Sequence, residues 1–176
     1  ITLFIKGLGF YKESVVAANF GLSKILDTFY IAYLIPSFIM IVFISAFNNV
    51  FIPNYVAELK IGNDISALQS VGFLITFLVS LFFTLIAFLV TDVYLENFFP
   101  GHTPDYYALI KSHFYFVMPC IIFWGFSSLL SGLLNIKKEF RHSTISGIFM
   151  PIAIIATLFL FRDSLGNMVL AVGTLI

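Results

Sequence analysis

The chain has 176 residues, of which 60% are hydrophobic, 18% aromatic and 10% charged, with nine Lys and Arg balancing nine Asp and Glu. Because a soluble domain usually carries about 25% charged residues, this composition is typical of an integral membrane protein. The nine cations provide no basic stripe for nucleic acid. The single cysteine, Cys120, excludes an internal disulfide framework and a four-thiolate metal site.

Long uncharged stretches divide the chain into candidate membrane spans. A helix rises about 1.5 Å per residue, so about 20 residues cross a bilayer core. The sequence predicts an all-α, polytopic transmembrane helix bundle, with helices at about 1–21, 25–58, 65–93, 106–136 and 142–161 and a partial helix at 166–176. Since both ends are apolar and the first residue is not Met, we expect residues 1–176 to be an incomplete part of a longer protein.

The first predicted span carries charged residues on one face. Lys6, Gly9, Lys12 and Glu13 share an arc of roughly 120° at the helical period. Ionisable groups inside a membrane cost about 2.5–3.5 kcal/mol each and usually mark a functional site. Two inward-facing cations favour an anionic ligand, and Gly7 and Gly9 allow close backbone approach or a bend. The alternative is that Lys12 and Glu13 lie near a membrane surface and extend to water.

Polar faces also run along the next three spans, and the first of these, at 25–58, is interrupted by Pro36. Such faces either line a cavity or pack against other helices, and the two readings have even weight for span 65–93. We expect cavity-lining roles for Tyr30, Tyr33, Ser37, Asn48, Gln69, Ser80, Thr84, Trp124, Ser131 and Asn135.

Cations cluster in the link from Lys137 to His142. By the positive-inside rule this link is cytoplasmic, which also places the link beginning at Lys60 inside. The links around Lys24, Lys111 and Arg162 are then outside.

No catalytic or metal-binding motif accompanies these helices. The sequence has no phosphate-binding glycine loop, paired zinc histidines or nucleophile elbow. His102, His113 and His142 are scattered, which favours structural roles. We therefore expect no enzymatic activity, no metal and no cofactor.

Two runs of residues in the first two predicted spans have a recognisable order and spacing. The first is Leu8-Gly9-Phe10-Tyr11-Lys12-Glu13-Ser14-Val15-Val16-Ala17, followed by Phe20-Gly21, Leu26-Asp27-Thr28-Phe29, Ala32-Tyr33 and Ile35-Pro36. The second is Ser45-Ala46-Phe47-Asn48-Asn49-Val50-Phe51-Ile52-Pro53-Asn54-Tyr55-Val56-Ala57-Glu58. Together they resemble the opening of the MurJ/MviN family of lipid II flippases. Beyond Lys60 the resemblance is mostly in the number of helices.

The resemblance implies a two-lobe exporter with a central cavity, of which this chain is the N-terminal lobe and the missing C-terminal lobe is a partner. Such an exporter carries a polyprenyl-diphosphate-linked sugar across the bacterial inner membrane by alternating access. Lys6, Lys12, Glu13 and Asp27 align with charged functional positions of the family. Asp27 alternatively caps the second helix.

The family pattern is changed at three positions, which are Ile5, Met40 and Ser45. Lysine also selects a diphosphate less strictly than the bidentate guanidinium of arginine does. The resemblance therefore implies lipid II or a related lipid-linked glycan as the substrate.

In this role, Lys6 and Lys12 would attract the diphosphate, Glu13 would orient a lysine, and Gly7, Gly9 and Pro36 would absorb bending. Membrane lipids would surround the bundle. Two alternatives stay open: a cation-coupled multidrug antiporter of the same superfamily, in which carboxylates dominate binding, and a non-transporting membrane scaffold.

Overall fold

The computed structural model describes residues 2–62 and 65–176, and within these ranges the chain forms helices and no strands. The predicted all-α fold is therefore confirmed. The helices are α1 (Thr2–Phe20), α2 (Lys24–Ile39), α3 (Ser45–Ile61), α4 (Ser66–Phe98), α5 (Pro104–Val117), α6 (Cys120–Ile136), α7 (Phe140–Ile145), α8 (Phe149–Leu165) and α9 (Val169–Leu175). Short segments of other helical types join some of them: η1 (Met40–Ile44), η2 (Ser146–Ile148) and η3 (Gly166–Met168).

Four helical stretches in the described ranges are long and apolar enough to cross a membrane: Lys24–Ile61, Ser66–Phe98, Pro104–Ile136 and Phe140–Leu175. The last one reverses direction where α8 meets α9, at Gly166, whose φ of 50° lies in the left-handed region. Large apolar side chains such as Phe10 and Leu89 are exposed on the outside of the bundle, as expected for a surface covered by lipid.

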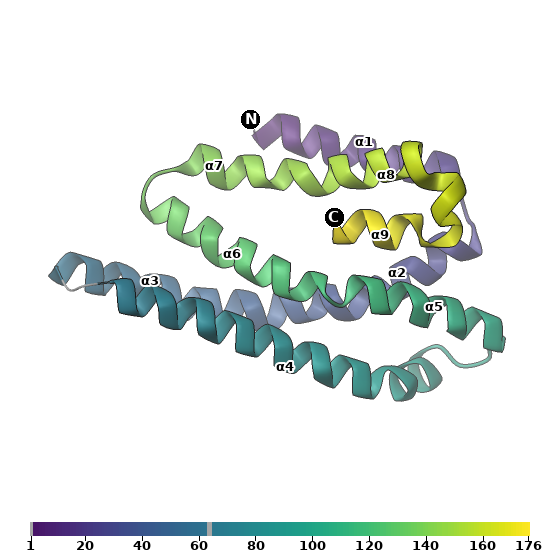
Figure 1. Ribbon diagram of the computed structural model, residues 1–176, viewed down its shortest axis with the longest axis horizontal. Helices are drawn as coiled ribbons and strands as arrows, with labels where there is room; N and C mark the ends of the chain where they lie inside the picture. Colours follow the sequence, from purple (N-terminus) through teal and green to yellow (C-terminus); the bar gives the residue numbers. More distant parts are fainter. Residues whose placement is uncertain (1, 63–64) are drawn as a thin grey trace.

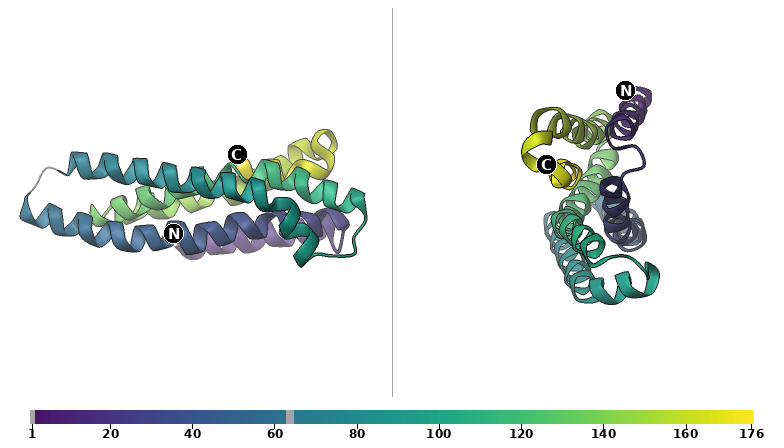
Figure 2. Two further views of the ribbon diagram at one scale, coloured as in Figure 1. Left: turned by 90° about the horizontal axis from the view of Figure 1, so that it is seen from below. Right: turned by 90° about the vertical axis from the view of Figure 1, so that its right-hand side faces the viewer.

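The successive helices run back and forth along one long axis (Figure 1). The end of α3 and the turn between α6 and α7 lie at one end of the bundle. The turns from α1 to α2, from α4 to α5 and from α8 to α9 lie at the other. Viewed end-on in Figure 2, α1, α8 and α9 occupy one part of the cross-section, and α3, α4 and α5 occupy the other.

The predicted spans differ from the observed helices in four places. The span predicted at 142–161 is observed as α7, η2 and α8, and α8 ends at Leu165. The second span contains the π-helical segment η1, which begins four residues after Pro36. The span predicted at 106–136 is divided at Pro119, where α5 gives way to α6. Helix α4 continues to Phe98 rather than to residue 93, and Asp92 within it forms a 2.5 Å ion pair with Lys111 of α5.

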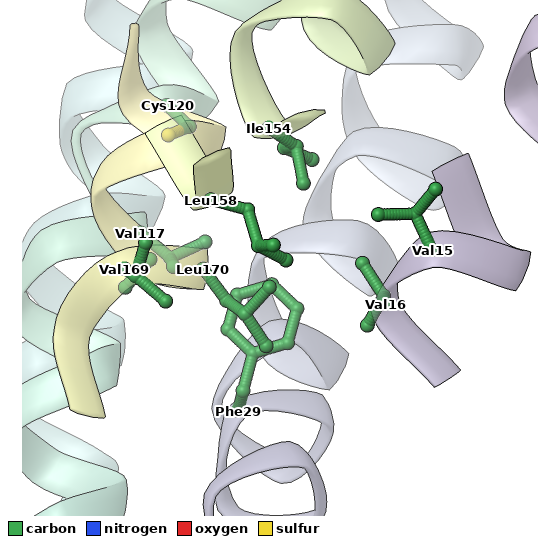
Figure 3. Close-up of a cluster of buried hydrophobic side chains, with 10 residues drawn as sticks. Val15, Val16, Phe29, Val117, Cys120, Ile154, Leu158, Val169 and Leu170 are labelled. Carbon is green, nitrogen blue, oxygen red and sulfur yellow. The ribbon is translucent and has the colours of Figure 1, made fainter. Parts of the chain in front are cut away.

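An apolar cluster ties the two parts of the bundle together (Figure 3). Val15 and Val16 of α1 meet Phe29 of α2, Leu158 of α8 and Leu170 of α9, all of them buried. Because these side chains come from helices distant in sequence, the cluster fixes how α1 lies against α2 and α8. It thereby positions Lys12 and Glu13, which lie about one turn before Val16 on α1.

The polar face of α4 is a packing surface. Ser80 and Thr84 are buried, and the Thr84 hydroxyl donates to the Ser80 carbonyl within the same helix at 2.7 Å. Helix α6 approaches so closely that a Cβ added to Gly125 would lie 2.7 Å from Ser80 Oγ and 3.2 Å from Thr76 Cγ2. The expected cavity-lining role of Ser80 and Thr84 is therefore corrected: small side chains on both helices allow α4 and α6 to pack closely.

Replacing Gly125→Val should force α4 and α6 apart and destabilise the protein by about 1–3 kcal/mol, the usual cost of overpacking. The measurement is the apparent melting temperature of the detergent-solubilised protein. The matched control is Gly147→Val, because Gly147 is exposed and a Cβ there meets only Ile5 Cγ2 at 3.5 Å. Equal melting temperatures for the two variants would contradict this packing.

Candidate functional site

An ion pair on the side of α1 that faces α2 forms the centre of the candidate site. Lys12 Nζ lies 2.5 Å from Glu13 Oε1, and the Tyr30 hydroxyl of α2 donates to Glu13 Oε2 at 3.0 Å. The Lys12 side chain is only 18% exposed, whereas that of Glu13 is 52% exposed. The charged face of α1 is therefore turned towards α2, and the lysine is the more enclosed member of the pair.

These residues line a small cavity, the Lys12 pocket, of about 90 Å³. Besides Lys12, Glu13 and Tyr30, its walls are mostly apolar and come from α1, α2, α8 and α9: Val16, Phe29, Tyr33, Met150, Ile154, Leu170 and Thr174. This volume has room for only a few water molecules. The pocket therefore fits one small charged group of a ligand rather than a whole sugar.

Lys12 lies midway along α1. At 1.5 Å per residue it is about 15 Å from Thr2 and about 12 Å from Phe20. Its amine points inward to Glu13 instead of extending towards either helix end. This arrangement favours the reading of Lys12 as a functional group over that of a lysine reaching for the membrane surface.

Asp27 belongs to a neighbouring pocket that shares Tyr30 with the Lys12 pocket. It accepts a short hydrogen bond from the Tyr106 hydroxyl, which connects α2 to α5. The proposed helix-capping role of Asp27 is wrong, because Ser23 is the N-cap of α2 and its side chain accepts from Leu26 N at 3.3 Å. The carboxylate of Asp27 is thus available to the pocket side of the helix.

A second, larger cavity continues from the Lys12 pocket, and the two share Tyr33 and Met150. This cavity, the Trp124 groove, has a volume of about 490 Å³. Its lining residues come from α2, η1, α6 and α8: Tyr33, Ser37, Met40, Ile41, Trp124, Ser127, Ser128, Ser131 and Met150. Four of the residues expected to line a cavity, Tyr33, Ser37, Trp124 and Ser131, are therefore brought together.

Other predicted residues lie elsewhere. Lys6 is exposed near the start of α1, outside both cavities. Gln69 donates to the Tyr55 hydroxyl at 2.5 Å between α4 and α3, and Asn135 is exposed near the end of α6. Asn48 does not line the groove but donates to Ser128, which does.

The three expected hinge residues differ in their surroundings. A Cβ added to Gly7 or Gly9 would meet nothing within 4 Å, and α1 is continuous through both positions, so neither close approach nor a bend is present here. Pro36 is buried in α2 and accepts, through its carbonyl, the backbone N–H of Met40 at the start of η1. The hinge role of all three remains a prediction.

Sequence reasoning missed η1, Tyr106 and Met150. A π-helical segment leaves no periodic signature, although such segments are frequent at functional sites. Tyr106 follows Asp105 at the start of α5, Met150 lies in an apolar stretch, and both reach the site only through packing. Among residues 2–62 and 65–176, no three His, Cys, Asp or Glu side chains lie close enough to hold a metal ion.

Comparisons with known proteins found a family and several relatives of this chain. The family described as "Lipid II flippase MurJ" matches residues 16–176. Three relatives are each named "Probable lipid II flippase MurJ". The relative from Buchnera aphidicola subsp. Schizaphis graminum is 30% identical over 93% of this chain and 33% of its own length. The relative from Aquifex aeolicus is 28% identical over 96% and 34%, and that from Rhizobium tropici is 26% identical over 90% and 31%.

No solved structure matches the chain. The chain spans about a third of the length of the curated relatives it matches. The family match covers residues 16–176, which include the helices that line the Trp124 groove and begin after Lys12 and Glu13 of α1. This chain belongs to the MurJ family of lipid II flippases.

Proposed function

We propose that this chain is the N-terminal lobe of a flippase that moves a polyprenyl-diphosphate-linked sugar, lipid II or a related lipid-linked glycan, across the bacterial inner membrane. The observation that carries the proposal is the Lys12–Glu13 ion pair, held in the middle of a membrane helix and turned into a pocket. An enclosed cation of this kind suits an anionic group that passes through the membrane.

In the empty state, Glu13 neutralises Lys12 and Tyr30 fixes the carboxylate. An arriving diphosphate competes with Glu13 for the lysine and forms charge-assisted hydrogen bonds to its amine. Lys6 is about two turns earlier on the same helix and provides a second cation along the path by which the diphosphate approaches Lys12. The protein makes and breaks no covalent bond in this cycle.

Transport would proceed by alternating access, in which this lobe rocks against the C-terminal lobe. Pro36 and the π-helical segment η1 supply a place where α2 and α3 can bend, because the regular hydrogen-bond pattern of the helix is interrupted there. Gly7 and Gly9 would serve the same purpose in α1, where no neighbouring side chain restrains them.

We assign the cytoplasmic side to the end of the bundle that holds the link from Lys137 to His142. The end of α3, with Lys60, lies at this same end, and the turns near Lys24 and Arg162 lie at the opposite one (Figure 1). This alternation agrees with the distribution of cations that the positive-inside rule requires.

Lys12→Ala should reduce flipping by about tenfold to hundredfold, since hydrogen bonds to charged groups contribute about 1.5–3 kcal/mol and 1.4 kcal/mol corresponds to tenfold. The full-length parent protein would be tested for growth of a bacterial strain depleted of its own lipid II flippase. Lys6→Ala should have a smaller effect and Lys12→Arg should retain activity. Lys137→Ala, in an exposed link, is the control.

Normal growth with Lys12→Ala would contradict the proposed role of the lysine. If normal growth persisted when Lys6, Lys12 and Glu13 were neutralised together, a scaffold that does not transport would replace the flippase. Failure of the unmodified protein to support growth, despite good membrane expression, would point to a different lipid-linked glycan.

Glu13→Gln distinguishes the flippase from a cation-coupled multidrug antiporter. In a flippase the loss should be smaller than with Lys12→Ala, because glutamine still accepts the Tyr30 hydrogen bond and Lys12 remains free to bind the diphosphate. In an antiporter the carboxylate is the binding group, and transport of organic cations should be abolished. The measurement is uptake of a fluorescent cationic dye beside the growth test.

A further inference from the structure

The Trp124 groove has a chemistry different from that of the Lys12 pocket. The Lys12 pocket offers a charged pair, whereas the groove offers an indole, a phenol and a row of serine hydroxyls on one face of α6. None of the residues that line the groove carries a charge. A group that binds there is therefore neutral, and it presents both apolar C–H faces and hydroxyls.

The position of Trp124 is fixed by Tyr33. The two rings meet edge to face, with centroids 5.5 Å apart and planes inclined at 64°. Aromatic rings have electron-rich faces that attract the weakly positive hydrogens of C–H groups, and the axial face of a pyranose ring presents such hydrogens. A fixed indole at the wall of a cavity is thus a platform on which a sugar ring can lie.

The serine hydroxyls are oriented by groups behind them. The Nδ2 group of Asn48 donates to Ser128 Oγ at 2.6 Å, so the Ser128 hydroxyl already has a donor behind it and its own hydrogen remains available to the groove. Ser131 Oγ is held 2.6 Å from Ser143 Oγ of α7. The wall therefore carries hydroxyls in fixed places, which is the arrangement needed to hydrogen-bond the hydroxyls of a sugar.

The groove also lies where the sugar has to be. In a lipid-linked glycan the first sugar is joined covalently to the diphosphate, and the groove shares Tyr33 and Met150 with the Lys12 pocket. The pocket has room for one small group, about 90 Å³, whereas the groove measures about 490 Å³ and falls in the size range of small-molecule sites.

From these observations, and resting on the proposed function, we infer that the Trp124 groove binds the first sugar ring of the substrate while the adjacent Lys12 pocket binds its diphosphate. Trp124 stacks on the ring, and Ser128, oriented by Asn48, donates a hydrogen bond to one of its hydroxyls. The groove, rather than the lysine, then distinguishes a sugar-bearing lipid from a bare polyprenyl diphosphate.

The test compares binding of two lipids to the purified full-length parent protein in detergent: lipid II, and a polyprenyl diphosphate without sugars. We expect Trp124→Ala to weaken lipid II binding about tenfold and to leave binding of the bare diphosphate unchanged. Trp124→Phe, which keeps an aromatic face, should restore much of the difference. Phe116→Ala replaces an exposed aromatic of α5 outside both cavities and should change neither affinity.

Unchanged binding of the bare diphosphate also serves as the test that Trp124→Ala remains folded. Equal loss of both lipids, or loss of neither, would overturn the assignment of the sugar to this groove. Lys12→Ala provides the separate test of the proposed function, because it should weaken both lipids together. If Lys12→Ala left both affinities unchanged, the diphosphate assignment would fail whatever Trp124→Ala did.

Discussion

The arrangement of the bundle around its candidate site depends on the accommodation of two opposite charges next to each other on α1. Lys12 and Glu13 are tolerated there because they neutralise each other at 2.5 Å and because Tyr30 satisfies the second carboxylate oxygen. Because Tyr30 belongs to α2, the hydrogen bond forms only when α1 lies against α2 with Glu13 turned towards Tyr30. The apolar contacts of Val16 with the neighbouring helices fix this rotation of α1 about its own axis.

Around this centre, the helices use small side chains in two different ways. Between α4 and α6 they allow close packing, as at Gly125 and Ser80, and the hydroxyls of Thr76 and Thr84 donate to carbonyls of their own helix. On an adjacent face of α6, serines such as Ser128 face a cavity that lies between α2 and α8. One helix thus provides both the rigid support of the lobe and the wall of its groove, which couples the shape of the groove to the packing of α4.

The charged and the neutral binding surfaces lie in different cavities of the lobe. The charged pocket is narrow and is closed by α8 and α9, whereas the neutral groove is wide and bordered by the π-helical segment η1. Met40, where this chain departs from the family pattern, lies at the start of η1 and lines the groove. Because the thioether of Met40 is neutral, Lys12 is the only cation among the described residues that line these two cavities, which is consistent with the proposed separation of diphosphate and sugar.

The sequence by itself determined the membrane spans, the charged face of α1 and the family, because hydrophobic length, helical periodicity and residue order are local properties of the chain. It could not decide which polar faces are buried. Ser80 and Trp124 both lie on polar faces of predicted spans, yet one is sealed against α6 and the other lines a groove. Periodicity fixes the direction of a side chain from its own helix axis, whereas its surroundings depend on which helix packs opposite it. Only the tertiary structure decided that, as it decided the N-cap of α2 and the meeting of Tyr106 with Asp27.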